Sequence, residues 1–589
     1  MKYGILAYLL IQTTTYGLNC DKSFTFYEDY GQNSFNVTCE GITKGYEHIL
    51  ENITINNEIS LTIIDSILEN VTPNIFKNVK NIKILNIFNC SLTFNKELSI
   101  FNKLEKLEVL NIRDTSFEIE NATLTGLNNL KKLQLMNNSL STIAQQGFNY
   151  LNNLEKLDLI NNKIEKVDDL QLCNLRKLKV LDLSRNKISK LSNFFCPTSE
   201  QTLGFNINSE LTSPILGDIT NYYNITSVTN DLIDLDLSHN QIVDLGYALD
   251  EMVKLKYLDL GFNKLTNIKL ISLKSLVKLQ KLHLNNNKLR VFNGNLFSNK
   301  SVLNFVDLSF NYLKQFVCSN IVQLRDLDLS FNNLTRVLLN DLPQLQEVDL
   351  KFNYLQSDLV FQKVPNLISV NLASNHLNNL GFLKNITNLR NLSLRNNSLN
   401  NLPDKVFAGL HELKNLDLSF NNIQNASFFD LNNLEILNLS YNNIESLSYD
   451  LLEPLKSLRV LDLASNKLVF IEYDVILSKL PTLNNINIKF NQLTCDNLTK
   501  FIQYLKQRHI IYTNSENVAL DNLSQNVAGI PCRFAVISNI KQKNSVLYNL
   551  GICLIVGFVA ILTSIVCYRF YIYMKRRRYR PDEFELVVD

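Results

Sequence analysis

The sequence lacks the features that would mark an enzyme or a nucleic-acid-binding protein. Its 58 Lys and Arg nearly balance its 56 Asp and Glu, and a net charge of +2 over 589 residues excludes a whole-protein electrostatic attraction to nucleic acid. It contains no Gly-rich phosphate loop and no HExxH, GxSxG or CxxC motif, and its six His are scattered. We therefore predict a protein that is not an enzyme, needs no cofactor and holds no metal ion.

Long apolar runs are also scarce, and the first lies at the N-terminus. Residues 1–17, MKYGILAYLLIQTTTYG, combine one basic residue, a short apolar stretch and then small and polar residues. This order is typical of a secretory signal peptide, and we predict cleavage after Gly17. An uncleaved anchor and a buried strand are the alternatives, but the apolar stretch is too short to span a bilayer.

The second apolar run lies near the C-terminus. Residues 550–568, LGICLIVGFVAILTSIVCY, carry no charge over about the length that crosses a bilayer, and a basic cluster, KRRR, follows at 575–578. By the positive-inside rule the basic side is cytoplasmic. We predict one transmembrane helix at 549–570, a short cytoplasmic tail at 571–589 and a single-pass plasma-membrane protein with its N-terminus outside. A buried core helix is the alternative.

Most of the remaining chain repeats one template, LxxLxLxxNxL. It is clear in LEKLDLINNKI (154–164), LRDLDLSFNNL (324–334) and LRVLDLASNKL (458–468). The Asn position or its substitute recurs at 66, 90, 115, 138, 162, 186, 240, 263, 287, 311, 332, 353, 375, 397, 421, 442, 466 and 491. The wide gap between 186 and 240 predicts one degenerate turn near 203–211 and an irregular insertion near 190–231.

The template has a simple physical interpretation. In LxL the two Leu side chains point to the same side of a strand and face the core. The Asn then turns the chain, and its amide satisfies backbone groups of neighbouring turns. A single turn cannot bury its apolar face alone, so the turns must stack.

These residues carry a family resemblance. The segment 58–493 resembles an extracellular leucine-rich repeat solenoid of about 18–19 turns. The resemblance implies an α/β fold, a curved horseshoe with a parallel sheet on its concave face. It also implies an N-terminal cap at 18–57 that contains Cys20 and Cys39. A C-terminal cap and stalk at 494–548 would hold one disulfide, Cys495–Cys532, because Asn497 stands where a second cysteine is usual.

The overall layout resembles the ectodomains of Toll-like receptors and insect leucine-rich transmembrane proteins. It departs from the receptors in one respect, since no cytoplasmic signalling domain follows the predicted span.

Four cysteines lie inside the repeats. Cys173 and Cys196 fall at nearly the same place on neighbouring turns, and adjacent strands are about 4.8 Å apart, so either a bridge or two free thiols fits. We expect Cys90 to be buried in the Asn ladder and Cys318 to be a sheltered thiol.

N-glycosylation sequons are numerous, and all precede the predicted span, as a secreted face requires. We predict glycans at Asn36, Asn52, Asn70, Asn121, Asn224, Asn299, Asn333, Asn385, Asn425, Asn497 and Asn522. Further sequons occur at Asn89, Asn137, Asn391, Asn396 and Asn438, of which Asn391 and Asn438 would face the concave side.

Two residue stripes suggest a ligand-binding surface. The fifth template position is often Asp and faces out from the concave sheet, while the eighth is often Phe. The stripes coincide at Asp307, Phe310, Asp328, Phe331, Asp349 and Phe352, which we predict as a protein-contact patch. The alternatives are simply solvated carboxylates, rings that pack on one another, and a rival patch in the 190–231 loop. His239 and His283 face the same side and could sense pH.

These features predict a cell-surface recognition protein. Its ectodomain would bind an extracellular protein or a microbial ligand, and any signalling would pass through a co-receptor or a homodimer. The alternative is a cell-adhesion protein that acts by homophilic or heterophilic solenoid contacts. The ligand cannot be deduced from a repeat scaffold.

Overall fold

The structure is a computed structural model that describes residues 20–27, 32–45, 50–51, 58–170, 172–192, 194, 231–250, 252–269, 273–297, 302–403, 405–426, 428–447, 452–513 and 526–533. The predicted signal peptide at 1–17, the predicted span at 549–570 and the tail at 571–589 lie outside these residues. Among the helices within these ranges, none is both long enough and apolar enough to cross a membrane.

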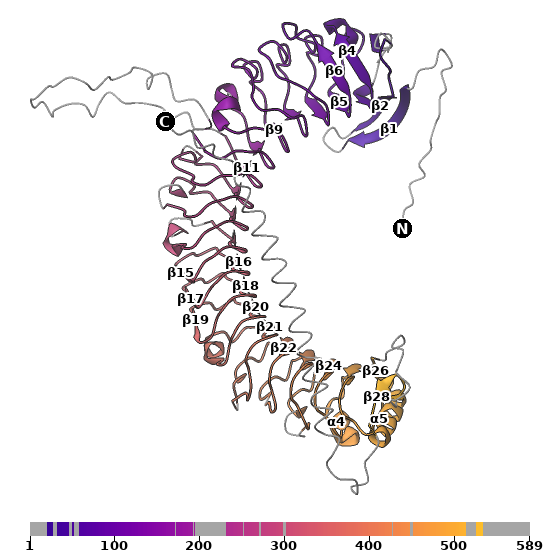
Figure 1. Cartoon of the computed structure of the whole chain (residues 1–589), viewed down its shortest axis with the longest axis vertical. Coiled ribbons are helices and arrows are strands. Elements are labelled where there is room, and N and C mark those ends of the chain that lie inside the picture. Colours follow the sequence, from indigo (N-terminus) through magenta and orange to yellow (C-terminus); the bar gives the residue numbers. More distant parts are fainter. Residues whose placement is uncertain are drawn as a thin grey trace, which may run out of the picture.

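One parallel sheet runs the length of the molecule along its concave side (Figure 1). It begins with the hairpin of β1 (Cys20–Tyr27) and β2 (Gln32–Glu40), and from β2 and β3 (Glu58–Ile64) onward each strand pairs in parallel with the strand of the next turn. The following strands are β5 (Ile84–Phe88), β7 (Val109–Arg113), β8 (Lys132–Gln134), β9 (Lys156–Asp158), β10 (Val180–Asp182), β11 (Asp234–Asp236), β12 (Tyr257–Asp259), β13 (Lys281–His283), β14 (Phe305–Asp307), β16 (Asp326–Asp328), β18 (Glu347–Asp349), β20 (Ser369–Asn371), β21 (Asn391–Ser393), β22 (Asn415–Asp417), β23 (Ile436–Asn438), β24 (Val460–Asp462), β25 (Asn485–Asn487) and β26 (Ile511–Tyr512).

The opposite, convex side is built of short pieces. Strands β15 (Gln315–Ser319), β17 (Arg336–Asn340) and β19 (Asp358–Gln362) form a second parallel sheet there, as Figure 1 shows. A smaller sheet pairs β4 (Ile67–Val71) with β6 (Ser91–Phe94). The described 3₁₀ helices are η2 (Pro73–Phe76), η3 (Val167–Leu170), η4 (Leu172–Asn174), η5 (Gly294–Phe297) and η6 (Gly381–Asn385), and α4 (Tyr473–Lys479) is an α-helix inside the repeats.

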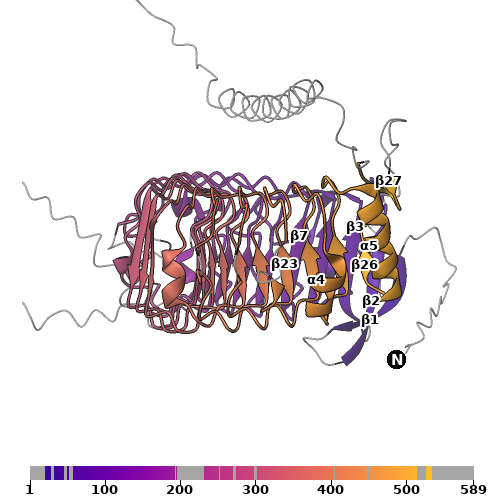
Figure 2. The ribbon, with the colours of Figure 1, turned by 90° about the horizontal axis from the view of Figure 1, so that it is seen from below.

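The prediction of an α/β fold therefore overestimates helix. Consecutive ladder residues such as Asn311 and Asn332 are separated by a short repeat, and most of it is used by the strand and the turns. A return path this short has room for 3₁₀ turns or short strands, and even the longer one that holds α4 accommodates only seven helical residues, about two turns. The described chain is a β-solenoid, seen along its stack in Figure 2.

The core is a continuous column of Leu with an Asn ladder beside it. Leu327 and Leu329, the LxL pair of one turn, are almost fully buried. Asn332 of that turn donates its Nδ2–H groups to the carbonyls of Leu308 (2.9 Å) and Leu329 (3.1 Å). Its Oδ1 accepts the backbone N–H of Leu313 (3.0 Å). The amide thus links two turns and satisfies buried backbone hydrogen-bonding groups, as the template predicts.

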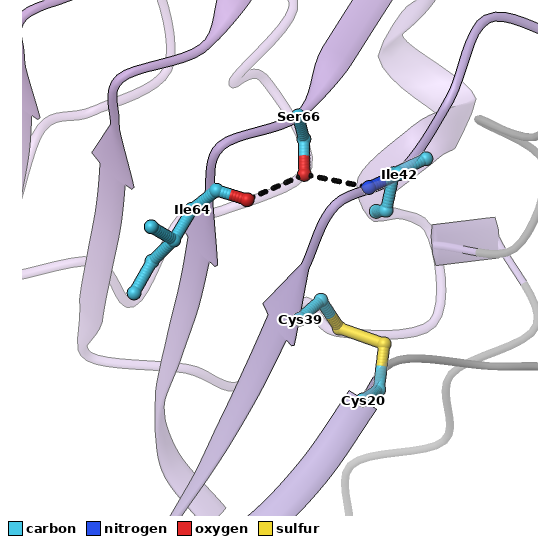
Figure 3. Close-up of a disulfide and its surroundings, with 5 residues drawn as sticks. All are labelled: Cys20, Cys39, Ile42, Ile64 and Ser66. Atoms are coloured by element: carbon cyan, nitrogen blue, oxygen red, sulfur yellow. Dashed lines mark hydrogen bonds between the residues drawn. A yellow bond between two sulfur atoms is a disulfide. The ribbon is translucent and has the colours of Figure 1, made fainter.

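The first turns satisfy the same groups with other residues. Ser66 donates its hydroxyl to the carbonyl of Ile64 (2.7 Å) and accepts the backbone N–H of Ile42 (3.0 Å), which Figure 3 shows beside the Cys20–Cys39 disulfide. Cys90 occupies the ladder position of the next turn with its sulfur 3.2 Å from the carbonyl oxygen of Phe88, and burial raises the pKa of its thiol. A hydroxyl or thiol therefore substitutes for the amide.

The described turns on either side of the wide gap in the ladder contact each other directly. Strand β10 pairs directly with β11, and Asp182 lies opposite Asp236. The ladder closes in the same way, because Oδ1 of Asn240 accepts the backbone N–H of Ile188 (2.9 Å) and its Nδ2–H donates to the carbonyl of Leu183 (2.9 Å). The degenerate turn predicted near 203–211 lies outside the described residues, and no described strand separates β10 from β11.

Each end of the stack carries a disulfide. At the N-terminal end, β1 (Cys20–Tyr27) and β2 (Gln32–Glu40) form an antiparallel hairpin that pairs with β3, and Cys20 is bonded to Cys39 with S–S 2.10 Å. At the other end, Cys495 begins α5 (Cys495–Gln507) and is bonded to Cys532 with S–S 2.13 Å. Cys532 follows a two-stranded sheet of β27 (Asn526–Val527) and β28 (Ile530–Pro531).

Asn497 explains why one disulfide suffices at this end. Its side chain is 3% exposed. Its Oδ1 accepts the backbone N–H of Ile471 and its Nδ2–H donates to the carbonyl of the same residue, both at 3.0 Å. The amide thus fastens α5 to the preceding repeat by hydrogen bonds.

Candidate functional site

The three predicted aspartates end three neighbouring strands of the concave sheet. The strand register places Asp307 of β14 opposite Asp328 of β16, and Asp328 opposite Asp349 of β18. All three side chains are partly buried. The structure therefore brings these carboxylates together in a row, as their template position predicts.

Each aspartate also has a structural role that the sequence reasoning missed. Oδ1 of Asp307 accepts the backbone N–H of Ser309 (2.9 Å). Asp328 accepts that of Ser330 (2.8 Å), and Asp349 accepts that of Lys351 (2.9 Å). The carboxylate thus stabilises the turn that leaves the strand, as Asp side chains do in Asx turns. The recurring D-x-S spacing in LDLS was the available signal.

Burial and mutual repulsion act on the middle carboxylate. Burial raises the pKa of Asp328 above its usual value, hydrogen bonds from Ser330 oppose this rise, and the charges of Asp307 and Asp349 add to it. At the end of the row, Nζ of Lys351 lies 2.8 Å from Oδ2 of Asp349, and this hydrogen bond raises the pKa of Lys351.

A second acidic run precedes the first on the same face. Asp158, Asp182, Asp236 and Asp259 end β9 to β12 and lie opposite one another in register. Burial raises the pKa of Asp182 to about 6, with the charges of Asp236 and Asp158 contributing to the rise. Burial also raises the pKa of Asp259.

His283 separates the two acidic runs. It ends β13 between Asp259 and Asp307, and its ring lies 4.8 Å from that of Phe305. A strip of carboxylates, which we call the acidic strip, therefore extends from β9 to β18 with one imidazole in it. His239, the other His considered from the sequence, is placed three residues past β11, where its ring stacks on Phe262 at 4.1 Å.

The three predicted phenylalanines form a stack. Ring centroids of Phe310 and Phe331 are 4.1 Å apart, and those of Phe331 and Phe352 are 4.4 Å apart. Phe310 and Phe352 nevertheless remain 47% and 48% exposed. The rings pack on one another, as the alternative interpretation holds, and still present a surface to solvent.

The backbone at this position has an unusual conformation. Phe310, Phe331 and Phe352 have φ of 53°, 54° and 54°, in the left-handed region that bulky residues rarely adopt. Other turns place Asn161, Asn286 or Asn396 there, and Asn tolerates this region better. The aromatic residues are therefore not required by the backbone.

Two exposed tyrosines that the sequence reasoning missed lie beside the stack. Tyr312 and Tyr354 follow Phe310 and Phe352 by two residues and are 42% and 52% exposed. The backbone N–H of Tyr312 donates to the carbonyl of Leu289 (2.8 Å), and that of Tyr354 donates to the carbonyl of Leu334 (2.9 Å). Each Leu is the last residue of the template on the preceding turn. With the three Phe they form an aromatic patch on the turns of β14, β16 and β18.

The structure separates the predicted glycosylation sites into three groups. Asn36 is 8% exposed and its side chain is hydrogen-bonded to Ser60, and the buried Asn497 is described above. A glycan has no room at either, so these two predictions are corrected. Exposed positions are Asn70, Asn121, Asn333, Asn385 and Asn425. Asn52, Asn224, Asn299 and Asn522 lie outside the described residues.

The cysteines inside the repeats are described in part. Cys90 and Cys318 are buried free thiols. Burial raises the pKa of Cys318 to about 12, which keeps its thiol protonated and unreactive. Cys196 and the side chain of Cys173 lie outside the described residues. The same is true of residues 195–230, which form most of the rival patch.

Comparisons with known proteins agree with the repeat and the fold. The leucine-rich repeat family matches residues 106–164, 128–188, 152–199, 253–313, 323–345, 387–427 and 422–468. No curated protein sequence matches the chain.

Two solved structures share the fold at low sequence identity. A chain of the glycosylated Toll–Spatzle complex of Drosophila is 20% identical, with a TM-score of 0.63 over 86% of this chain and 71% of that chain. A leucine-rich repeat protein of Leptospira interrogans is 23% identical, with a TM-score of 0.50 over 70% of this chain and 91% of that chain. The protein is therefore a leucine-rich repeat solenoid with structural similarity to the Toll receptor fold.

Proposed function

We propose that the protein is a cell-surface recognition protein whose acidic strip binds a basic extracellular protein. The single observation that carries this proposal is the surplus charge of the strip. At the same template position, Asn371 accepts the backbone N–H of Ala373 (3.2 Å), and Asn438 accepts that of Ser440 (3.0 Å). The turn needs an acceptor and does not need a negative charge.

The charge also carries a cost in the folded state. Burial raises the pKa of Asp182, Asp259 and Asp328, so each carboxylate is less favourable in the fold than in water. Neutral Asn would satisfy the turn without this cost. Carboxylates in register across neighbouring strands gain most from a ligand that brings several Lys or Arg to the concave face.

The geometry suits a protein ligand rather than a small molecule. The strip extends over the consecutive strands β9 to β18 of an open, curved surface, and solenoids use such concave faces to bind extended partners. Lys351 already pairs with Asp349, which gives an internal example of the contact that we propose for the ligand.

An extracellular, membrane-anchored location is part of the proposal. Two disulfides at the ends of the stack fit an oxidising compartment, where such bonds persist. We interpret the N-terminal hairpin and α5 as the two caps, 1–17 as a signal peptide and 549–570 as the anchor. The Toll chain that shares this fold occurs in a complex with Spatzle, which is compatible with a protein ligand here.

The proposal is tested on cells that display the full chain. The probe is a panel of labelled extracellular proteins of similar size, ranging from acidic to basic. We expect basic members to bind, and their binding to weaken with added salt because exposed charge pairs are screened. The variant D307N/D328N/D349N, which keeps the acceptor for each turn, should lose at least tenfold in affinity, or about 1.4 kcal/mol.

The matched control is D417N/D462N. These aspartates make the same backbone contacts, to Ser419 and Ala464 (2.9 Å each), but neighbour Ser393, Asn438 and Asn487 instead of other carboxylates. Binding should be unchanged in this variant. Equal binding by the triple variant and wild type would overturn the proposal, and clustering of the displaying cells without any probe would favour adhesion instead.

A further inference from the structure

One sequon lies inside the aromatic patch. Asn333 directly follows the ladder residue Asn332 and is exposed. Its backbone N–H donates to the carbonyl of Leu313 (2.9 Å), and the next turn repeats this contact from Tyr354 to Leu334 (2.9 Å). Asn333 therefore occupies the same position as Tyr312 and Tyr354 and lies between them on consecutive turns.

Aromatic residues lie on the two turns adjacent to Asn333 and near it in the chain. Tyr312 lies on the preceding turn and Tyr354 on the following one. Phe331 comes two residues earlier in the chain, within the stack of rings. At the equivalent position the turn before this group carries Lys288 and the turn after it carries His376, whose ring lies 5.7 Å from that of Tyr354.

We propose that Asn333 carries an N-linked glycan whose first sugars lie over Tyr312 and Tyr354. The C–H face of a pyranose ring is apolar and packs well against aromatic faces, which Tyr exposes together with a polar hydroxyl. The sequence FNNLT (331–335) supplies both the acceptor and the hydroxyl residue Thr335 at the required spacing. The glycan covers apolar rings that would otherwise face solvent.

The glycan also restricts how a partner approaches. It would occupy the side of the solenoid next to the Phe stack, while Asp307, Asp328 and Asp349 lie on the strands of the concave face. A ligand would then contact the acidic strip and not the tyrosines. This inference rests on the proposed passage through the secretory pathway.

Another exposed sequon provides the internal reference. The side-chain oxygen of Asn121 accepts the backbone N–H of Gln146 (2.9 Å), and the residue belongs to a turn far along the stack from Asn333. Its occupancy reports whether the chain is glycosylated at all. Tyr247, 64% exposed and on another turn, is the matched reference for tyrosine reactivity.

The test uses the full chain made in eukaryotic cells. Glycopeptide mass spectrometry measures occupancy at Asn333 and Asn121, and hydroxyl-radical footprinting measures the modification of Tyr312, Tyr354 and Tyr247. Wild type should be occupied at Asn333. Tyr312 and Tyr354 should react several-fold more in N333Q than in wild type, with Tyr247 unchanged. T335S keeps the sequon and should behave as wild type.

Four results would overturn the inference. Occupancy at Asn121 with none at Asn333 would refute it while leaving the secretory location intact. Full occupancy at Asn333 with equal reactivity of the tyrosines in wild type and N333Q would show that the sugars do not lie over the rings. Protection that persists in N333Q and grows with protein concentration would assign the patch to contacts between two copies. Absence of any glycan would refute both this inference and the proposed location.

Discussion

The concave sheet has two regions in which different side chains accept the backbone N–H of the turn that leaves the strand. From β9 to β18 the position that caps the turn is Asp on every strand except β13, which has His283. From β20 to β25 it alternates among Asn, Ser and Asp, so the register neighbours of Asp417 and Asp462 are uncharged, and Nδ2 of Asn487 lies 3.1 Å from Oδ2 of Asp462. The second region therefore separates its carboxylates, while the first places them side by side. Because the backbone is the same in both, the difference concerns the surface that each region presents.

The largest effect is expected for substitutions of ladder residues, which test whether the two regions have the same core. Asn353 and Asn442 are ladder residues of the first and second region, and each donates to two Leu carbonyls at 2.9–3.0 Å. Replacing either with Ala leaves buried backbone groups unsatisfied and should lower the free energy of unfolding by about 2–4 kcal/mol. Urea unfolding measures this. A much larger loss for one variant than for the other would show that the cores differ as well as the surfaces.

An intermediate effect is expected for a substitution of Asp182, which tests how much the surplus charge of the strip lowers the stability of the fold. The pKa of Asp182 is raised from 3.8 to about 6 in the folded state, so the folded protein binds a proton more readily than the unfolded chain. Its contribution to stability therefore falls as pH rises from about 4 to 6. Asn cannot ionise and can still accept from Ser184, so D182N should be more stable above pH 6 by about 1–2 kcal/mol after allowance for solvent screening.

The pH dependence provides the control for D182N. The advantage over wild type should disappear below pH 4, where both side chains are neutral, and thermal unfolding at several pH values measures this. D417N, whose register neighbours Ser393 and Asn438 are uncharged, should change stability less. A D182N advantage that persists at low pH would mean that packing, not charge, is responsible.

The smallest effect is expected for a substitution of Lys351, which lies at the boundary of the two regions. Lys351 neutralises Asp349 through a partly exposed ion pair, and such pairs contribute about 0–1 kcal/mol. K351Q should leave stability nearly unchanged but free Asp349 for the basic ligand, which should bind about two- to fivefold more tightly, or about 0.4–1 kcal/mol. Titration of the displayed chain measures this. Weaker binding in K351Q would mean that the ligand contacts Lys351 itself.

Much of this molecule could be predicted because each turn repeats the same local rule. The LxL pairs, the ladder residues such as Asn332 and the alignment of Asp307, Asp328 and Asp349 follow from spacing alone. The substitutes Ser66 and Cys90 were also visible from their place in the series. Spacing ceases to constrain the chain at the wide gap in the ladder. The 54-residue separation of Asn186 and Asn240 does not show which strands pair across it, and the structure pairs β10 with β11.

The candidate site was predictable in position and not in chemistry. Sequence spacing placed the carboxylates in a row, but it could not show that each accepts a backbone N–H or that burial raises the pKa of Asp182. A sequon motif cannot distinguish the buried amides of Asn36 and Asn497 from the exposed one of Asn333. Both failures concern burial, which depends on neighbours from other turns.

The sequence by itself determined the repeat, the apolar core and the order of the turns, because these depend on which residue types recur at fixed intervals along one chain. The tertiary structure alone decided what lies next to what across turns. It closed the stack between β10 and β11, buried Asn497 against Ile471 and placed Asn333 between Tyr312 and Tyr354. The physical reason is that stacking brings together residues separated by one whole repeat, and hydrogen bonding and burial act through space.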